Sequence, residues 1–340
     1  MSSGGRLGRA TMEDVARLAG VSRQTVSRVI NESDLVSAKA RGRVLAAMEE
    51  LDYRRDAFAR SLAMRRTFVL GVLTTSFSLY VHGRALEGAE AYARSHGYSL
   101  IVTGSEASET GEPIGSELLR HQPMEGLMIL YHGSTRDTYE VVRNLPRNLP
   151  VVTTGYAPET AGVRACNIEN HLGSLRATRR LISVGRRNLA IIAGPEWDLE
   201  ALERTRGFND ALSEAGLAQE GKNVRFGRWS MESGYNEMVH LLSTKRVLDG
   251  VVTNSDWQAV GAIRAIHEAG VRVPEDVAVV GFGDLPIAKY VQPSITTARH
   301  MAFELGQLCC RQLINRIEHG GEGSDESPLI PEVVVRESCP

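Results

Sequence analysis

Side chains that carry several hydrogen-bond donors lie close together near the N-terminus. Arg23, Gln24 and Arg28 carry guanidinium and amide groups, which pair with base edges in the major groove. Hydroxyl, amide and amino groups around them can bind phosphate oxygens, and these belong to Thr11, Ser22, Thr25, Ser27, Asn31, Ser37 and Lys39. We therefore expect the first set to contact DNA bases, and the second set to contact the DNA backbone or cap helices.

The sequence around these side chains predicts a short helix that ends in a tight turn. Thr11 is placed as an N-cap, and Asp14 follows three residues later, which is the arrangement of a capping box. Val15, Leu18 and Ala19 then form an apolar stripe at helical spacing.

A second helix is predicted to follow directly. Gly20 ends the first helix and Ser22 caps the second, which turns three apolar side chains inward, Val26, Val29 and Ile30. The candidate base-contacting side chains are then left on the outer face. A third helix completes a small all-α unit, with helices expected at 12–19, 23–31 and 38–51. The alternative interpretation is an ordinary helical hairpin with a solvated polar face.

Four short motifs give this segment a resemblance to a known family. They are Asp14–Ala16, Ala19–Ser22, Thr25–Asn31 and Val36–Arg41. By these motifs, residues 11 to about 65 resemble the DNA-binding headpiece of the lac-repressor (LacI/GalR) family of bacterial transcription regulators. The resemblance continues to nearly the last residue, and it implies a helix-turn-helix whose second helix reads the major groove.

The basic segment after the third helix resembles the hinge helix of that family. In the family, the hinge helices of two subunits pair in the minor groove, where a leucine from each subunit wedges into the central base step. Leu62 occupies the wedge position and Ala59 permits close approach of the two helices. Asp56 stands where the family usually has asparagine. The alternative is a flexible basic linker, because so short a helix is unstable alone in water.

Charge is distributed unevenly along the 340 residues. Residues 1–66 contain 13 Lys and Arg against 8 Asp and Glu, whereas the remainder contains 26 against 33. A basic N-terminal part on an acidic body is typical of a DNA-binding module attached to a domain of another kind.

Several classes of protein are disfavoured by what the sequence lacks. The four cysteines have no metal-ligand spacing, and no apolar run reaches the length of a membrane span. No nucleotide-binding, hydrolase or metalloprotease motif occurs, so we expect neither an enzyme nor a cofactor. The missing secretory signal argues against a solute-binding protein of a transporter. We therefore expect a cytoplasmic, nucleoid-associated protein.

From Phe68 onward, apolar strands alternate with amphipathic helices. Strands are expected at 68–73, 98–102, 126–130, 150–153, 188–193, 250–253, 277–282 and 330–336. Buried strands alternating with helices imply parallel sheets covered on both faces. The family resemblance implies two such sheets, so the fold class is an all-α helix-turn-helix headpiece on a two-lobed, periplasmic-binding-protein-like α/β body.

The resemblance also implies where the chain divides. A disordered tail would cover 1–10, the headpiece 11–52 and the hinge helix or linker 53–66. The effector-binding and dimerisation domain would cover 67–340. Within it, lobe one is expected at about 67–165 and 298–328, and lobe two at about 166–297 and 329–340.

A small-molecule site is expected between the lobes, beyond the carboxyl ends of the strands. The candidate effector-binding residues are Phe77, Tyr131, Arg204, Trp229, Asp256 and Asp284. By resemblance, Arg204 matches an arginine that contacts sugar hydroxyls, and Trp229 matches an aromatic residue that stacks on the effector. Alternatively, Arg204 pairs with a nearby acid and Trp229 belongs to the core.

Some positions depart from the pattern of sugar-binding members. Ser255 and Gly283 stand where the family usually has asparagine and aspartate, Gly155 stands where some members have aspartate, and Leu130 where some have asparagine. Each change removes a polar contact of about 1 kcal/mol. A simple sugar is therefore a weaker candidate for the effector than a modified or phosphorylated sugar or a more apolar molecule.

Together these features predict a transcriptional repressor that binds a palindromic operator as a homodimer. A small molecule in the cleft, a sugar or sugar derivative, would release or tighten it. The alternative is a regulator controlled by a protein corepressor, without a small-molecule effector.

Overall fold

The structure is a computed structural model in which the chain divides into two compact units, Met1–Thr67 and Phe68–Pro340. Each unit is described by itself. The structure describes residues 10–30, 35–53, 66–74, 77, 80–104, 123–130, 142, 145–146, 148–155, 163–217, 223–244, 247–320 and 327–340. Residues 1–9 of the expected tail, the hinge residues Ala59 and Leu62, and the candidate contacts Asn31 and Tyr131 lie outside these ranges.

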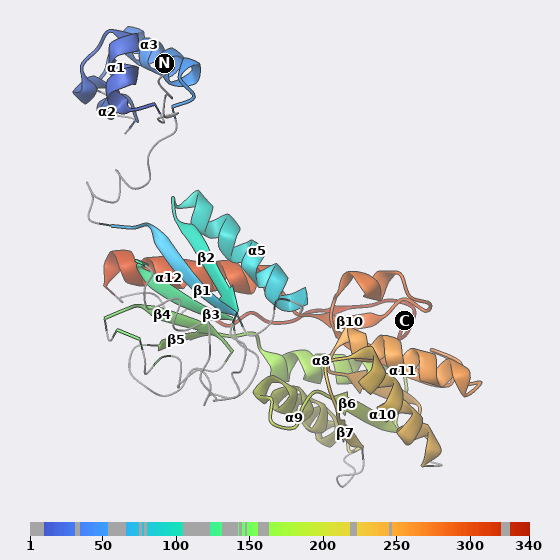
Figure 1. The fold of residues 1–340 in the computed structure, drawn as a ribbon. Helices are drawn as coiled ribbons and strands as arrows, with labels where there is room; N and C mark the ends of the chain where they lie inside the picture. The colour runs from blue at the N-terminus through green and yellow to red at the C-terminus, as the bar shows by residue number, and fades with distance from the viewer. Residues whose placement is uncertain are drawn as a thin grey trace, which may run out of the picture. The chain divides into compact units, whose positions relative to one another are not determined.

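The first unit contains three helices, α1 (Met12–Ala19), α2 (Arg23–Ile30) and α3 (Ala38–Glu50) (Figure 1). The predicted capping box is present, because the Thr11 hydroxyl accepts from the Asp14 N–H at 3.3 Å and the Asp14 carboxylate accepts from the Thr11 N–H at 3.0 Å. Gly20 ends α1 with a φ of 62°, a left-handed conformation that glycine adopts without strain.

The core of this unit is small. Val15, Val26 and Val44, one from each helix, are fully buried. Leu18, expected on the apolar stripe, is instead 45% exposed. The other two helices cover only the side of α1 that carries Val15 and Ala19. Leu18 lies beyond the edge of that side.

The second unit contains two parallel sheets, which confirms the expected fold class. The five-stranded sheet has the order β2 (Ser99–Gly104), β1 (Val69–Thr74), β3 (Gly126–Leu130), β4 (Val151–Thr154) and β5 (Val163–Cys166). We call the part of the chain built on this sheet lobe one. All its strand pairs are parallel.

The six-stranded sheet has the order β11 (Val333–Val334), β10 (Thr296–Arg299), β9 (Ala278–Gly283), β8 (Gly250–Thr253), β6 (Leu189–Ala193) and β7 (Val224–Phe226). We call this part lobe two. Its pairs are parallel except β10 with β11. Strands β5, β7 and β10 were not predicted, since each is short and interrupted by polar or charged residues.

Helices cover these sheets in pairs. In lobe one, α5 (Tyr80–Ser95) and α12 (Ala302–His319) pack together against one face (Figure 1). In lobe two, α8 (Asn170–Ser183) and α9 (Leu199–Glu214) cover one face, whereas α10 (Met231–Ser243) and α11 (Asp256–Glu268) cover the other. A short 3-10 helix, η1 (Pro286–Lys289), follows β9. Alternate residues of β6 and β8 enter the two cores, as the strand period requires.

The chain crosses between the two sheets where β5 leads to α8, where β10 leads to α12, and again after α12. Two of these crossings lie side by side, because Ile168 and Leu329 form a parallel bridge. The Glu169 N–H donates to the Leu329 carbonyl at 2.8 Å, and the Leu329 N–H donates to the Asn167 carbonyl at 3.0 Å. The lobes are thus joined by paired backbone rather than by independent linkers.

Glycines allow two of the helix pairs to approach closely. A Cβ atom at Gly88 of α5 would overlap the backbone carbonyl of Phe303 in α12, and one at Gly306 would overlap the carbonyl of Ala85. Gly234 of α10 and Gly261 of α11 allow the same close approach, because a Cβ atom at either position would overlap backbone of the other helix. In each pair, backbone packs against backbone at the crossing point.

We predict that Gly88→Ala destabilises lobe one by about 1–3 kcal/mol, because the added methyl group must push apart two backbones that cannot give way locally. Differential scanning calorimetry would show a lower midpoint of thermal unfolding. Gly83→Ala is the matched control, since no atom lies within 4 Å of a Cβ at this position of the same helix. The control should be neutral or slightly stabilising through helix propensity. Equal midpoints for the two variants would contradict the interpretation.

Candidate functional sites

The outer face of α2 presents the predicted base-contacting side chains. Arg23, Gln24 and Arg28 are all exposed, whereas Val26 and Val29 on the opposite side are buried in the core. The structure therefore places the three candidates together on one accessible face of an eight-residue helix. A helix presented in this way fits the width of the major groove.

Several predicted backbone contacts serve as helix caps. The Ser22 hydroxyl accepts from the Thr25 N–H at 3.1 Å and lies 2.9 Å from the Thr25 hydroxyl. The Ser37 hydroxyl accepts from the Ala40 N–H at 3.4 Å at the start of α3. Lys39 is exposed in the first turn of α3, and Ser27 is half-buried. Exposed helix N-termini of this kind attract phosphate groups through their backbone N–H groups.

The cap of α1 also affects the ionisation of the Asp14 carboxylate. The hydrogen bond from the Thr11 hydroxyl lowers the pKa of Asp14, and the nearby Arg17 guanidinium, 3.2 Å away, acts in the same direction. Asp14 thus stays ionised at the positive end of the helix dipole, which favours the start of α1.

A pocket lies in the second unit at the carboxyl ends of β8 and β9. It is bordered by the first residues of α5 in lobe one and by several segments of lobe two. Its described lining residues are Tyr80, Val81, Arg204, Trp229, Ser255, Trp257, Phe282, Gly283, Leu285 and His300. Arg204 and Trp229, both predicted from the sequence, are among them.

Arg204 is the most strongly engaged residue of this lining. Its side chain is 3% exposed, and its Nε donates to the Asn170 Oδ1 at 2.8 Å. Nη1 donates to the carbonyl of Asn254 at 2.6 Å, and Nη2 donates to the carboxylate of Glu200 at 3.0 Å. The ion pair with Glu200 is the alternative that the sequence left open, and it coexists with the position of Arg204 in the pocket lining.

Aromatic rings surround the Arg204 guanidinium. Its central carbon lies 3.9 Å from the centre of the Phe282 ring and 5.4 Å from that of Trp229. The indole of Trp229 packs on Gly194 at the end of β6, where any side chain would overlap the ring. The Phe282 ring meets the His300 ring edge to face, with centres 6.2 Å apart. These rings form a continuous flat-sided wall.

Asp256 is fully buried and does not belong to the described lining. Its Oδ1 accepts from the Thr297 hydroxyl at 2.6 Å, and its Oδ2 accepts from the Leu285 N–H at 2.7 Å. Burial raises the pKa of Asp256 to about 6, although both hydrogen bonds favour the ionised form. The carboxylate thus fixes the turn after β9 against β10, directly behind the pocket.

Asp284 and Phe77 are also outside the described lining. Asp284 adopts a positive φ of 55°, and its carboxylate pairs with Arg299 at 2.9 Å and with Arg336 near the C-terminus. Phe77 is 66% exposed, and its ring lies against Gly104 at the end of β2. The structure therefore separates these two side chains from Arg204 and Trp229.

Most of the described lining residues were not among the candidate effector-binding residues. Trp257 follows Asp256 directly at the end of β8, so the strand-end pattern gave a signal for it. Tyr80 and His300 gave none, because they lie on α5 and on the crossing before α12, far from the strand ends of lobe two. Only the tertiary fold brings them to the pocket.

Membrane spans and metal sites are two further classes of site to consider. Within the described ranges, no helix combines the length and apolarity needed to cross a membrane. The same residues form no group of His, Cys, Asp and Glu side chains that could hold a metal ion. The four cysteines are free thiols and buried.

Comparisons with known proteins match family models to two separate parts of the chain. Residues 11–56 match the family model described as bacterial regulatory proteins, lacI family, and residues 178–339 match that of a periplasmic binding protein-like domain. The ribose operon repressor of Escherichia coli (strain K12) is 34% identical over 331 residues, covering 97% of this chain and 100% of the relative.

Two further similarities extend along nearly the whole chain. The HTH-type transcriptional repressor PurR of Pasteurella multocida (strain Pm70) is 31% identical, covering 97% of this chain and 98% of the relative. Among solved structures, the lac repressor dimer bound to operator and the anti-inducer ONPF is 30% identical, with a TM-score of 0.82 and coverage of 98% and 99%.

We predict that the raised pKa of Asp256 makes one contribution to stability that falls as the pH rises. The folded state holds the proton more tightly than the unfolded state, so this contribution is complete below pH 3.8 and is lost as the pH passes about 6. Relative to Asp256→Asn, the free energy of unfolding of the wild type should fall by up to about 3 kcal/mol between pH 4 and pH 7. Denaturant titrations at several pH values measure this difference.

Asp276→Asn supplies a control of the opposite sign. Hydrogen bonds from Arg272 hold the pKa of Asp276 at about 2, so its contribution is present above pH 3.8 and is lost as the pH falls toward 2. If the wild type and Asp256→Asn show parallel stability curves from pH 4 to pH 7, the assignment to Asp256 is wrong.

Proposed function

The chain belongs to the lacI family of bacterial regulatory proteins, which bind DNA rather than catalyse reactions, and from this we propose that it represses transcription as a homodimer on a palindromic operator. A small molecule in the pocket between the lobes controls its affinity for the operator. Such a regulator acts on the bacterial nucleoid in the cytoplasm. The exposed face of α2, held on a capped three-helix unit, is the observation that carries the proposal.

Sequence recognition is assigned to three side chains of that face. Arg23, Gln24 and Arg28 contact base edges, because guanidinium and amide groups form bidentate pairs with guanine and adenine. Each good pair discriminates against a wrong base by about 1–3 kcal/mol. The capping hydroxyls and Lys39 orient the unit through phosphate contacts that carry no sequence information.

The hinge proposal depends on residues outside the described ranges. Leu62 inserts into the central base step of the operator, and Ala59 allows the two hinge helices to touch. Insertion of an apolar wedge unstacks the bases at a cost of a few kcal/mol and bends the duplex, which brings more of the protein into contact.

Dimerisation follows from the size of one recognition helix. A single α2 reads too few base pairs to select one site in a genome, whereas two helices on a palindrome double the readout. The similar lac repressor structure is a dimer bound to operator. We place part of the interface on β2, the edge strand of lobe one, where Ile101 and Val102 are 37% and 39% exposed.

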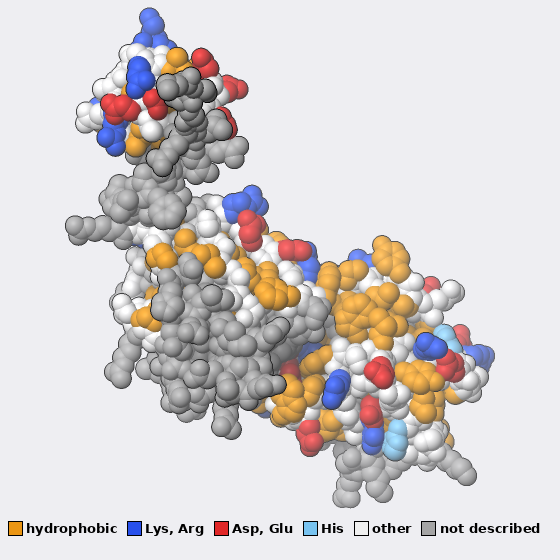
Figure 2. All heavy atoms as spheres, viewed as in Figure 1, with side chains coloured by type: hydrophobic (Ala, Val, Ile, Leu, Met, Phe, Trp, Pro, Cys, Tyr) orange, Lys and Arg blue, Asp and Glu red, His pale blue; other side chains and the backbone are white. Residues whose placement is uncertain are grey.

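Lobe two offers a second apolar surface to the partner. Tyr290, after η1, is 82% exposed, and Figure 2 shows hydrophobic side chains gathered on the surface of this lobe. Exposed apolar surface on an edge strand and on a neighbouring lobe is typical of a protein interface.

Regulation is assigned to the pocket because both lobes contribute to its wall. Tyr80 and Val81 come from α5 of lobe one, whereas Arg204 and Trp229 come from lobe two. A ligand that contacts Tyr80 of lobe one and Trp229 of lobe two therefore favours one relative position of the lobes. It shifts the operator-binding equilibrium only by the difference in its affinity for the two states. Asp256 and Asp284 support this site from behind by fixing the turn after β9.

We predict that Arg28→Ala and Gln24→Ala each weaken operator binding by about tenfold or more, since each removes a bidentate base contact. Bound sequences are first selected from a genomic DNA library, and affinities are then measured by fluorescence anisotropy at fixed salt. Arg94→Ala, an exposed charge of α5 paired with Glu90, is the control for loss of one positive charge. Equal affinity of wild type and variants for selected and random DNA would contradict the assignment.

We also predict a mass of twice the 37.1 kDa chain in sedimentation equilibrium. Val102→Glu should shift the mass toward that of the monomer, because a carboxylate would be buried at the interface. Val239→Glu, at a residue of α10 that is 44% exposed, introduces the same charge away from β2 and should leave the dimer intact. A monomeric wild type would contradict the dimer proposal.

A further inference from the structure

Two polar side chains of the described lining, Arg204 and Ser255, hydrogen-bond within the protein itself. Each nitrogen of the Arg204 guanidinium donates a hydrogen bond within the fold. The Ser255 hydroxyl caps α11 by accepting from the Gln258 N–H at 3.2 Å. The Gln258 amide, in turn, donates to the carbonyls of Ala193 and Arg228.

The carboxylates nearest the pocket are engaged in the same way. Both oxygens of Asp256 accept hydrogen bonds, from Thr297 and from Leu285, and Asp284 pairs with two arginines. Gly283, between them in space, lines the pocket without a side chain. The charged side chains in and beside the described lining are therefore committed to partners within the fold rather than to ring hydroxyls.

Aromatic residues make up half of the described lining. Tyr80, Trp229, Trp257, Phe282 and His300 contribute five rings, and the aliphatic groups of Val81 and Leu285 fill the spaces beside them. Aromatic rings prefer to stack on one another or to meet edge to face, which adds about 0.5–1.5 kcal/mol per pair to burial of apolar area.

The charge of the site selects against ionic ligands. A cage of aromatic rings attracts cations, but here the Arg204 guanidinium already lies near the rings of Phe282 and Trp229 and would repel a second positive charge. An anion gains little, because Glu200 offsets the charge of Arg204 at 3.0 Å. The ligand that fits is uncharged.

We propose that the effector is bound through an uncharged planar aromatic or heteroaromatic ring, stacked among Tyr80, Trp229 and Trp257, rather than through the hydroxyls of a free monosaccharide. The inference rests on the proposed function, since it names the chemical class of the ligand of the regulatory pocket. A sugar also stacks a face on tryptophan, but its hydroxyls lose water on entry and need partners in the plane of the ring. An aromatic ring carries no such requirement.

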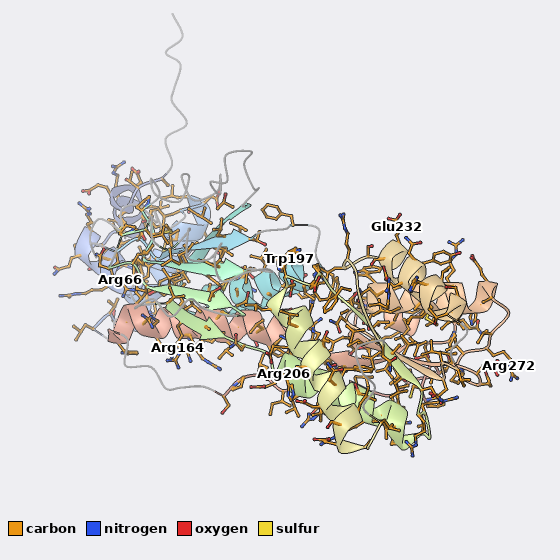
Figure 3. All side chains as sticks on the ribbon, turned by 90° about the horizontal axis from the view of Figure 1, so that it is seen from below. Arg66, Arg164, Trp197, Arg206, Glu232 and Arg272 are labelled. Atoms are coloured by element: carbon orange, nitrogen blue, oxygen red, sulfur yellow. The ribbon has the colours of Figure 1, made fainter. Side chains whose placement is uncertain are left out.

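Intrinsic fluorescence provides a direct assay. The chain has three tryptophans, of which Trp229 and Trp257 line the pocket, whereas Trp197 precedes α9 and is 64% exposed (Figure 3). The full-length protein is titrated with adenine, phenyl β-D-glucoside, D-ribose, D-glucose and choline. We expect at least one ring-bearing probe to quench the fluorescence at a concentration at least tenfold lower than ribose, glucose or choline.

The two ring-bearing probes distinguish the source of the ring. Binding of adenine without phenyl β-D-glucoside indicates a free heteroaromatic base, and the reverse indicates an aryl group attached to a sugar. Either result supports the proposal. It is overturned if ribose, glucose or choline binds as tightly as both ring-bearing probes, or if neither ring-bearing probe binds.

Variants test whether stacking in this pocket causes the quenching. Trp257→Leu should weaken binding of the ring-bearing probe by about tenfold or more. Trp197→Leu is the matched control and should leave the affinity unchanged. Tyr80→Ala, a change at a 39% exposed residue that does not endanger the core, should weaken binding by about fivefold. Unchanged affinity in both pocket variants would overturn the proposal.

Operator binding, measured on the same samples without ligand, separates a failure of the proposed repressor function from a failure of the proposed ligand class. Failure of the wild type to select any operator contradicts the proposed function, whatever the probes do. Selective operator binding together with preference for a monosaccharide leaves the repressor function standing and overturns the proposed ligand class alone.

Discussion

The buried guanidinium of Arg204 is the interaction on which lobe two depends most. A charge that is 3% exposed must be fully paired, because its desolvation costs several kcal/mol. The pairing draws on Asn170 of α8, Glu200 of α9 and the backbone at Asn254 after β8, while the flat side of the group rests on Phe282 of β9. One side chain thus joins two helices and two strands, and removal of either partner would leave a buried charge uncompensated.

The same residue links the architecture of lobe two to its site. Because Arg204 fixes the carboxyl end of β8 and the ring of Phe282, it also fixes the wall on which Trp229 lies. Asp256 and Asp284 extend this constraint to β10 and to the segment containing Arg336. The lobe-two side of the pocket is therefore held in place by contacts within that lobe.

Close backbone packing ties the helices of each lobe together. Gly88 with Gly306, and Gly234 with Gly261, bring helix backbones into direct contact, where a larger side chain would overlap the neighbouring helix. The paired crossings at Ile168 and Leu329 join the backbones of the two lobes. The headpiece has no comparable core, and three fully buried valines with well-formed caps hold it together.

The sequence by itself determined the elements whose signals are local. The capping box of Thr11 and Asp14, the glycine turn at Gly20, the outward face of α2 and the buried strands such as Gly126–Leu130 all follow from residue type and period. Family motifs added Arg204 and Trp229. The tertiary structure alone decided the strands β5, β7 and β10, which pair despite polar residues because the neighbouring strands supply their partners. It also engaged the Asp256 and Asp284 carboxylates with partners inside lobe two and placed Tyr80 and His300 in the pocket lining. Contacts between segments far apart in the chain set the direction of a side chain at a strand end, and no local pattern encodes them.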